Sequence, residues 1–340
     1  MNVLSLFDGM SCGQIALDQL GVKVDNYYAS EIDKYAIKVT QKNYPNTKQI
    51  GSVTEVKGKD LPKIDLIICG SPCQGFSFAG KQLNFNDPRS ALFFQFVRLL
   101  RECKPKYFLL ENVRMKKEYQ EIISEYLGVE PVMINSALVS AQNRVRLYWT
   151  NIAGIEQPKD KGIVLKDILE DVVNDEYNVG QHLLDGYKGG DQLNPNYKSQ
   201  ANTIHRDKTA TLCAGTHGYS NGYVERPYSH REPKVLCGRI VGRKINPNTG
   251  KRDDYNPDLK AEQRLEPRLD KKSGTLTTVQ KDNVVITHPT YRKLTPLECE
   301  RLQTVPDGYT SGVSNTQRYK LLGNGFTVDV IKHILQEMIQ

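Results

Sequence analysis

The feature that most constrains the fold is an apolar run that ends in a stiff turn and a cysteine. Residues 64–69 are almost continuously apolar, and the run stops at Gly70-Ser71-Pro72. Such a run predicts a strand of a parallel sheet that is covered on both faces. Proline fixes its own φ and restricts the preceding residue, so the turn should be stiff. Cys73 is therefore expected just beyond the carboxyl end of a buried strand, where open α/β sheets bind their ligands.

Two earlier strands are predicted to end at a cofactor site. Residues 3–7 are apolar and pass through a small-residue turn, 8–13, into a helix pattern. Glycine lets the backbone of such a turn approach a ligand closely. A second strand, 27–30, ends at Glu31, 22 residues after Gly9 (31 − 9). An acidic residue there suits the two ribose hydroxyls of a nucleoside cofactor, although a solvated carboxylate is the alternative.

A further strand, residues 107–110, ends at Glu111, so a carboxylate and a thiol are expected at one edge of one sheet. Strands that alternate with helix patterns predict an α/β fold with a doubly wound, mostly parallel sheet. Residues 142–149 are predicted as another strand, whose alternation would put Gln142, Arg144 and Arg146 on one face. A solvated strand face is the alternative for these arginines.

Composition bounds the class of protein. The chain has 340 residues, of which 39% are hydrophobic and 25% charged, as expected for a globular protein with one large domain or two modest ones. No apolar run approaches the roughly 18 residues of a bilayer-spanning helix, and the first residues do not resemble a signal peptide. The seven cysteines form no C-x-x-C pair, which favours reduced thiols in the cytoplasm and argues against a disulfide framework and a zinc site. The net charge of +7 suits a nucleic-acid partner.

The composition changes after the predicted catalytic strands. From about residue 157 to 282 the chain is polar, rich in glycine, asparagine, tyrosine and lysine, and only weakly periodic. Basic and aromatic residues on loops suit contacts to phosphates and bases. Ordinary irregular surface is the alternative for any one of them.

Three motifs together resemble DNA cytosine-5 methyltransferases, and the resemblance covers nearly the whole chain. They are Pro72-Cys73-Gln74, Glu111-Asn112-Val113 and Gln142-x-Arg144-x-Arg146. The resemblance implies that Cys73 is the nucleophile and that Glu111 holds the amino group and N3 of the cytosine. It also implies that Arg144 contacts the ring carbonyl, with Gln142 and Arg146 as further catalytic residues.

The amino-terminal loop and Glu31 resemble the S-adenosylmethionine motifs of the same family. Ser11 and Cys12 stand where the usual bacterial loop has glycines, which is closer to the eukaryotic de novo enzymes. Ser52 stands where the family commonly has an aspartate. The cofactor-binding residues implied by the resemblance are Phe7, Asp8, Gly9, Met10, Cys12, Gly13, Glu31, Ile32, Ser52, Val53, Pro72, Leu92 and Asn324.

The resemblance also implies a domain plan and a reaction. Residues 1–156 and 316–340 would form a discontinuous catalytic domain of the S-adenosylmethionine-dependent methyltransferase type, and 157–315 an inserted, smaller, irregular target-recognition domain. The reaction would methylate C5 of a cytosine flipped out of double-stranded DNA, through a covalent bond from Cys73 to C6. A monomer on DNA, no metal, no membrane partner, a bacterial or phage source and a companion restriction endonuclease are expected.

Two alternatives remain open at this point. One is a tRNA cytosine-5 methyltransferase on the same scaffold, which the motifs alone do not exclude. The other is a catalytically dead DNA-binding homologue, against which the intact Cys73, Glu111 and Arg144 argue.

Overall fold

The computed structural model describes residues 1–71, 91–171, 208–209, 226–227, 235–246, 252–268, 270–278, 283–287 and 290–339. The predicted Pro72 and Cys73 lie outside these residues. The chain divides into two compact units. The first comprises residues 1–164, 275–278 and 296–340, and the second comprises 165–274 and 279–295.

The first unit contains a seven-stranded sheet in the order β3-β2-β1-β4-β5-β7-β6. Its strands are β1 (Asn2–Leu6), β2 (Asn26–Ser30), β3 (Lys48–Gln49), β4 (Leu66–Gly70), β5 (Tyr107–Val113), β6 (Val132–Asn135) and β7 (Val145–Thr150). The first five are parallel, and β7 runs antiparallel to both of its neighbours. The expected doubly wound, mostly parallel sheet is therefore confirmed.

The winding direction of the chain reverses between β1 and β4. From β1 the chain proceeds outward to β2 and β3, and then returns to place β4 on the other side of β1. Ligands of open α/β sheets bind outside the carboxyl ends of the strands at such a switch point. Those ends are Leu6 and Gly70, so the loop that follows β1 and Ser71, directly after β4, lie at the same site.

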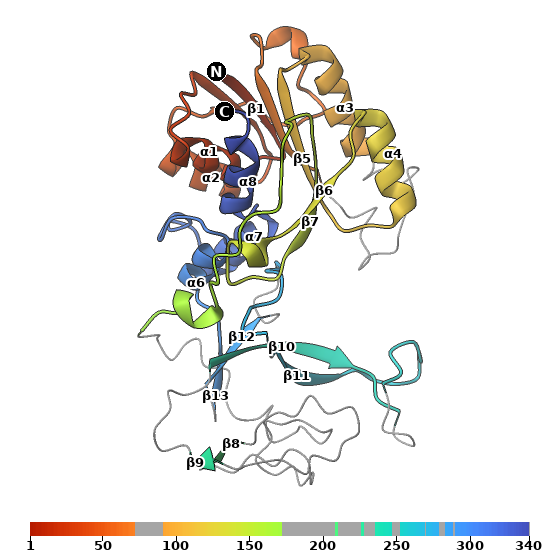
Figure 1. The fold of residues 1–340 in the computed structure, drawn as a ribbon, viewed down its shortest axis with the longest axis vertical. Helices are drawn as coiled ribbons and strands as arrows, with labels where there is room; N and C mark the ends of the chain where they lie inside the picture. Colours follow the sequence, from red (N-terminus) through yellow and green to blue (C-terminus); the bar gives the residue numbers. More distant parts are fainter. Residues whose placement is uncertain are drawn as a thin grey trace. The chain divides into compact units, whose positions relative to one another are not determined.

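Helices cover both faces of this sheet (Figure 1), with α1, α2 and α8 on one side and α3 and α4 on the other. The helices of the first unit are α1 (Cys12–Gln19), α2 (Lys34–Asn43), α3 (Ala91–Cys103), α4 (Lys117–Leu127), α6 (Pro296–Leu302), α7 (Asn315–Asn324) and α8 (Val328–Gln336), with 3-10 turns η1 (Gly58–Asp60) and η2 (Ser136–Leu138). On the α3 side, alternate strand residues such as Leu4 and Cys69 belong to one buried cluster with Phe93 and Phe96. Cys69 is fully buried within β4.

The second unit contains an antiparallel sheet in the order β11-β10-β12-β13. Its elements are the 3-10 turn η3 (Leu165–Ile168), the short pair β8 (Lys208–Thr209) and β9 (Arg226–Pro227), β10 (Val235–Arg243), β11 (Glu262–Arg268), β12 (Val284–Thr287) and β13 (Thr290–Lys293). The weak periodicity of this region did not predict the sheet. Gly238 and Gly242 interrupt the apolar pattern of β10, and Gly238 packs so closely that an added Cβ would lie 2.7 Å from Ile286.

The boundaries of the units differ from the expected domain plan. The second unit begins at residue 165 rather than 157 and ends at 295 rather than 315. Residues after 295 belong to the first unit because α6 is buried there: Leu302 has no exposed surface, and its carbonyl accepts a hydrogen bond of 2.6 Å from Ser140 Oγ. Among the described residues, no helix is long and apolar enough to cross a membrane.

Candidate active site

A cavity of about 450 Å³ lies at the carboxyl ends of the central strands of the first unit. Its volume falls within the roughly 300–1,000 Å³ range of small-molecule sites. Its lining comes from residues that follow β1, β2, β3 and β4, from the carboxyl end of β5, from the first turns of α1, α2 and α3, from the start of β7 with the residue before it, and from the end of α7. The predicted site residues in its lining are Phe7, Asp8, Gly9, Cys12, Glu31, Ile32, Ser52, Val53, Leu92, Glu111, Arg144, Arg146 and Asn324.

The loop after β1 is a tight turn with three left-handed residues. Phe7 has φ 55°, Gly9 has φ 60° and Ser11 has φ 61°. A residue other than glycine in this region costs on the order of 1 kcal/mol. The Ser11 hydroxyl donates to Asp8 Oδ2 and the Tyr27 hydroxyl donates to Asp8 Oδ1 at 2.9 Å. Ser11 therefore offsets part of its strain by binding the neighbouring carboxylate.

Asp8 is 7% exposed, and burial raises its pKa to about 6. The hydrogen bonds from Ser11, Ser5 and Tyr27 oppose this shift, and the charge of Glu31 adds to it. The cavity thus contains a carboxyl group whose pKa is raised well above the usual aspartate value by burial.

Glu31 is fixed at the cavity by backbone amides. Gly9 N donates to Oε2 at 2.7 Å, while Ile32 N and Asp33 N donate to Oε1 at 2.7 and 2.8 Å. Carboxylate oxygens have further acceptor capacity, so this group can still accept hydrogen bonds from a ligand. The side chain of Ile32 beside it is 77% exposed and offers an apolar surface. A charged acceptor next to an apolar surface suits a nucleoside.

Two predicted cofactor residues do not line the cavity. Met10 is buried at 1% exposure, and Gly13 lies against β4, where an added Cβ would stand 2.9 Å from Ile68 Cδ1. Gly13 therefore permits close packing of α1 on the sheet. Cys12 does line the cavity, and burial raises the pKa of its thiol to about 12, which keeps it protonated.

Ser71 and Asn112 also line this cavity, although neither was predicted as a site residue. They are 5% and 1% exposed, and within the described part of the chain Ser71 Oγ and Asn112 Nδ2 have no hydrogen-bond partner. Buried polar atoms without partners are rare in folded proteins and are expected where a ligand completes them. Their positions directly after β4 and within the end of β5 were the available sequence signal.

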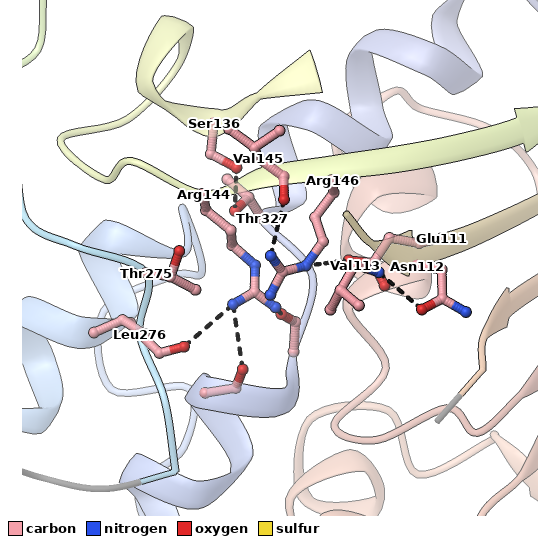
Figure 2. A network of polar contacts seen from close by, with 12 residues as sticks. Glu111, Asn112, Val113, Ser136, Arg144, Val145, Arg146, Thr275, Leu276 and Thr327 are labelled. Atoms are coloured by element: carbon pink, nitrogen blue, oxygen red, sulfur yellow. Dashed lines mark hydrogen bonds and ion pairs between the residues drawn. The ribbon is translucent and has the colours of Figure 1, made fainter. Parts of the chain in front are cut away.

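Glu111 forms an ion pair with Arg146 at the cavity (Figure 2). Arg146 Nε lies 2.9 Å from Glu111 Oε1, and the two side chains are 13% and 11% exposed. The strands β5 and β7 bring them together, because Val113 is paired with Arg146 and Glu111 with Tyr148. A second hydrogen bond, from Arg146 Nη1 to Val145 O at 2.9 Å, orients the guanidinium.

Arg144 points to a different set of partners. Its Nη1 donates to the carbonyls of Leu276 and Gly323, each at 3.3 Å, and its Nη2 donates to Gly325 O at 3.0 Å. Arg144 is 3% exposed, and burial, together with the charge of Arg146, lowers its pKa to about 10. The group remains a cation at neutral pH and is held by carbonyl oxygens.

The predicted single strand face for the three motif residues is wrong. β7 begins at Val145, so Gln142 and Arg144 precede it. Gln142 has no exposed surface, and its amide nitrogen donates to Leu302 O and Gln303 Oε1 while its oxygen accepts from Leu276 N. Because these bonds use both ends of the amide, Gln142 has a structural place rather than one in the cavity.

Comparisons with known proteins agree with this architecture. The family model of C-5 cytosine-specific DNA methylases matches residues 1–340. The orphan methyltransferase M.SPRI of Bacillus phage SPR is 28% identical over 100% of this chain and 97% of its own length. The type II methyltransferase M1.ScrFI of Lactococcus lactis subsp. cremoris is 29% identical over 99% of this chain and 78% of its own.

Solved structures show the same fold. A DNMT2 mutant of Spodoptera frugiperda has a TM-score of 0.62 at 18% identity and covers 100% of this chain and 99% of that one. The Entamoeba histolytica methyltransferase EhMeth has a TM-score of 0.61 at 17% identity, with coverage of 100% and 98%.

Proposed function

The chain belongs to the C-5 cytosine-specific DNA methylase family and is a DNA cytosine-5 methyltransferase, and we propose that it uses S-adenosylmethionine and a covalent cysteine intermediate. The observation that carries this proposal is that one cavity is lined both by the Glu31 loop and by the Glu111–Arg146 pair. Glu31 is thereby available to the cofactor, and Glu111 with Arg146 to the cytosine, in one cavity where these two ligands must meet. A methyl-transfer assay with tritiated cofactor on duplex DNA and on tRNA tests it.

The residues of the cavity fit the cofactor. Glu31 offers charged acceptors for ribose hydroxyls, Ile32 an apolar surface for the adenine, and Asp8 a carboxylate for the cationic end. Gly9 has no atom within 4 Å of the position of an added Cβ, so its backbone leaves open space for a ligand. When bound, S-adenosylmethionine supplies an electrophilic sulfonium methyl group.

We assign recognition of the cytosine to Glu111 and Arg146. Glu111 would accept a hydrogen bond from the exocyclic amino group and share a proton with N3, and Arg146 would donate to the ring carbonyl. The resemblance had given the carbonyl contact to Arg144, but its guanidinium is engaged by three backbone carbonyls. The guanidinium of Arg146 already lies beside the Glu111 carboxylate, so it can reach a base that Glu111 binds.

Cys73 remains the proposed nucleophile. Its thiolate would add to C6 and make C5 an enamine carbon, which would take the methyl group as the S–CH3 bond breaks and S-adenosylhomocysteine leaves. A base then removes the proton from C5, and the S–C6 bond breaks to restore the ring and the thiol. A stacked base hides C6, so the cytosine must leave the duplex at a cost of a few kcal/mol. Within the described residues the neighbouring thiols are poor substitutes, because burial raises the pKa of both Cys12 and Cys69.

We propose that the second unit reads the DNA. Arg239 and Arg243 lie on the same face of β10, and both donate to Glu266 of β11, Arg239 Nη2 at 2.8 Å and Arg243 Nε at 2.6 Å. Arginines held in this way lose little further freedom on binding phosphate or guanine. Together with the net charge of +7, this face supports a DNA contact.

The remaining expectations stay proposals. Duplex DNA in the cytoplasm, a monomer on DNA and a companion restriction endonuclease fit relatives that bear type II and orphan methyltransferase names. The tRNA reading is the second candidate, and the assay on both substrates separates it from DNA methylation. A catalytically dead homologue would show no transfer to either.

A further inference from the structure

Four residues of the chain leave the second unit and lie in the first. Residues 275–278, here called the strap, belong to the catalytic unit, whereas 165–274 before them and 279–295 after them belong to the second unit. The strap is therefore a piece of the proposed recognition segment that is built into the proposed catalytic unit.

The strap is held by three consecutive residues, Gln142, Asn143 and Arg144. Thr275 Oγ1 donates to Asn143 O at 2.8 Å, and Leu276 N donates to Gln142 Oε1 at 2.7 Å. The bond from Arg144 Nη1 to Leu276 O closes the set (Figure 2). The side chain of Leu276 is buried, with 7% of its surface exposed, so the strap packs into the first unit as well as forming hydrogen bonds with it.

Gly323 at the end of α7 is the other wall of this seat. A Cβ added to Gly323 would lie 2.4 Å from the carbonyl carbon and oxygen of Thr277 and 2.8 Å from the nitrogen of Thr278. These are backbone atoms, which cannot rotate away as a flexible side chain can. The strap can therefore lie here only because residue 323 is glycine.

Arg144 links the strap to the reacting end of the cavity. One guanidinium binds the strap carbonyl and the carbonyls of Gly323 and Gly325, which line the cavity, and it stands two residues before Arg146. A buried guanidinium that loses a carbonyl acceptor raises the free energy of the folded state. Its side chain is therefore expected to move until it binds another acceptor. A shift of the backbone at Arg144 would also move Val145, whose carbonyl accepts the hydrogen bond from Arg146 Nη1.

We propose that the strap is a positioning segment, which holds Arg144 and thereby Arg146 in register with Glu111 only while it is seated. This inference rests on the proposed function and extends it: seating of the strap makes methyl transfer depend on the recognition segment that continues the chain on either side. The strap touches neither the cofactor nor the base in this account. Its loss slows the chemical step and leaves binding of both ligands intact.

The test compares single-turnover methyl transfer in the full-length enzyme, with saturating duplex DNA and cofactor, across four variants. Gly323→Ala removes the space for the strap, and Thr275→Val removes its hydroxyl bond with almost no change of shape. Thr275→Ser keeps that hydroxyl and serves as the rescue variant. Ser140→Ala is the matched control, because Ser140 donates to Leu302 O, as Gln142 does, in the same buried region.

The expected result is a split between rate and binding. One lost hydrogen bond corresponds to about a fivefold effect, so Thr275→Val should slow single-turnover transfer about fivefold and Gly323→Ala more. Thr275→Ser and Ser140→Ala should stay within about twofold of the wild type on the same scale. Dissociation constants for DNA and cofactor should be unchanged in Thr275→Val.

Three outcomes overturn the inference. Thr275→Val transfers at the wild-type rate, or its loss lies in a dissociation constant, or Ser140→Ala slows transfer as much as Thr275→Val does. If Gly323→Ala does not fold, the two Thr275 variants still decide. Failure of the proposed function is distinguishable, since the wild-type enzyme would then methylate no cytosine in DNA.

Discussion

Arg146 and Glu111 form an ion pair across two antiparallel strands, with Nε 2.9 Å from Oε1 and both side chains less than one-seventh exposed. The two arginines of the motif are two residues apart and have different partners, carboxylate for Arg146 and carbonyl for Arg144. The difference separates a residue that can act on the base from one that is buried and holds its neighbours in position, and it leads to the first prediction.

Arg146→Ala should lower kcat by a factor on the order of 100, since the lost charge-assisted bond to the base is worth about 1.5–3 kcal/mol. Arg144→Ala should instead lower the free energy of unfolding, by about 1–3 kcal/mol for carbonyls left unpaired. Steady-state kinetics and thermal unfolding of both variants check this. The assignment is wrong if Arg144→Ala is stable and inactive while Arg146→Ala is active.

Glu31→Gln should weaken S-adenosylmethionine binding about 10–100-fold, the range that a charge-assisted hydrogen bond contributes. Glutamine is preferred to alanine because the carboxylate also accepts three backbone amides. Calorimetric titration measures the dissociation constant, and Glu55→Gln, on the exposed surface nearby, is the control. An unchanged constant would remove Glu31 from the cofactor site.

Asp8 should make stability depend on pH. Its pKa is raised to about 6 in the folded state, so between about 4 and 6 the folded protein keeps a proton that the unfolded chain has released. The contribution of Asp8 to the free energy of unfolding is then fully present at pH values below its unfolded pKa. This contribution, on the order of 3 kcal/mol, is lost as the pH rises through its folded pKa. Asp8→Asn should therefore raise the melting temperature at pH 8 and change it little at pH 4.

The control for this prediction is Asp25→Asn. Asp25 is exposed, and its pKa is lowered by the amino terminus, which donates to its carboxylate at 2.7 Å. Its replacement should not raise the melting temperature at pH 8. A wild-type melting temperature for Asp8→Asn at both pH values would contradict the buried, raised group.

Arg239→Ala should weaken DNA binding and reduce its salt dependence. An arginine on a phosphate contributes about one unit to the slope of log K against log salt concentration. The slope should fall by about that amount, equally for cognate and unrelated duplexes, if the contact is to phosphate. Loss confined to the cognate duplex would instead indicate base readout, worth about 1–3 kcal/mol. No effect on either duplex would exclude this face of β10 from DNA.

Cys73 should be trapped on DNA that carries 5-fluorocytosine at the target. Fluorine cannot leave C5 as a cation, so the S–C6 bond persists after methyl transfer and the complex survives denaturing electrophoresis. Trapping should require S-adenosylmethionine. Cys73→Ser should abolish it, because a hydroxyl is a far weaker nucleophile here. Cys12→Ser and Cys69→Ser should still trap, and an adduct mapped to either residue would refute the mechanism.

The apolar strands and the residues at their ends could be predicted because they depend on local signals. These signals are the spacing of apolar residues and the glycine, proline or polar residues that end each run. The apolar runs at residues 3–7 and 64–69 correspond to β1 and β4. Glu31 and Glu111, predicted at the carboxyl ends of strands, both line the cavity. These positions need no knowledge of distant contacts, since the carboxyl ends of neighbouring parallel strands meet at one edge.

The roles of Gln142 and Arg144 could not be predicted, because their partners lie more than one hundred residues away in sequence. Alternation placed both on one strand face with Arg146, yet Leu276 and Leu302 draw them into the core. The sheet of the second unit was missed for a related reason. The glycines and arginines of β10 interrupt the alternation of apolar and polar residues that predicts a strand. The segment becomes a strand through its antiparallel pairing with β11.

The discontinuity of the first unit also bears on how the protein is made. Helix α8, whose residues Val330, Ile331, Ile334 and Leu335 have no exposed surface, packs with α1 from the other end of the chain. At a synthesis rate of about 5–20 residues per second, the stretch between 164 and 296 delays the synthesis of α8 by about 7–26 seconds. A nascent chain on the ribosome thus shows an uncovered sheet face during that interval. Chaperone demand should be set by the length of the inserted segment, and shortening that segment should raise the soluble yield.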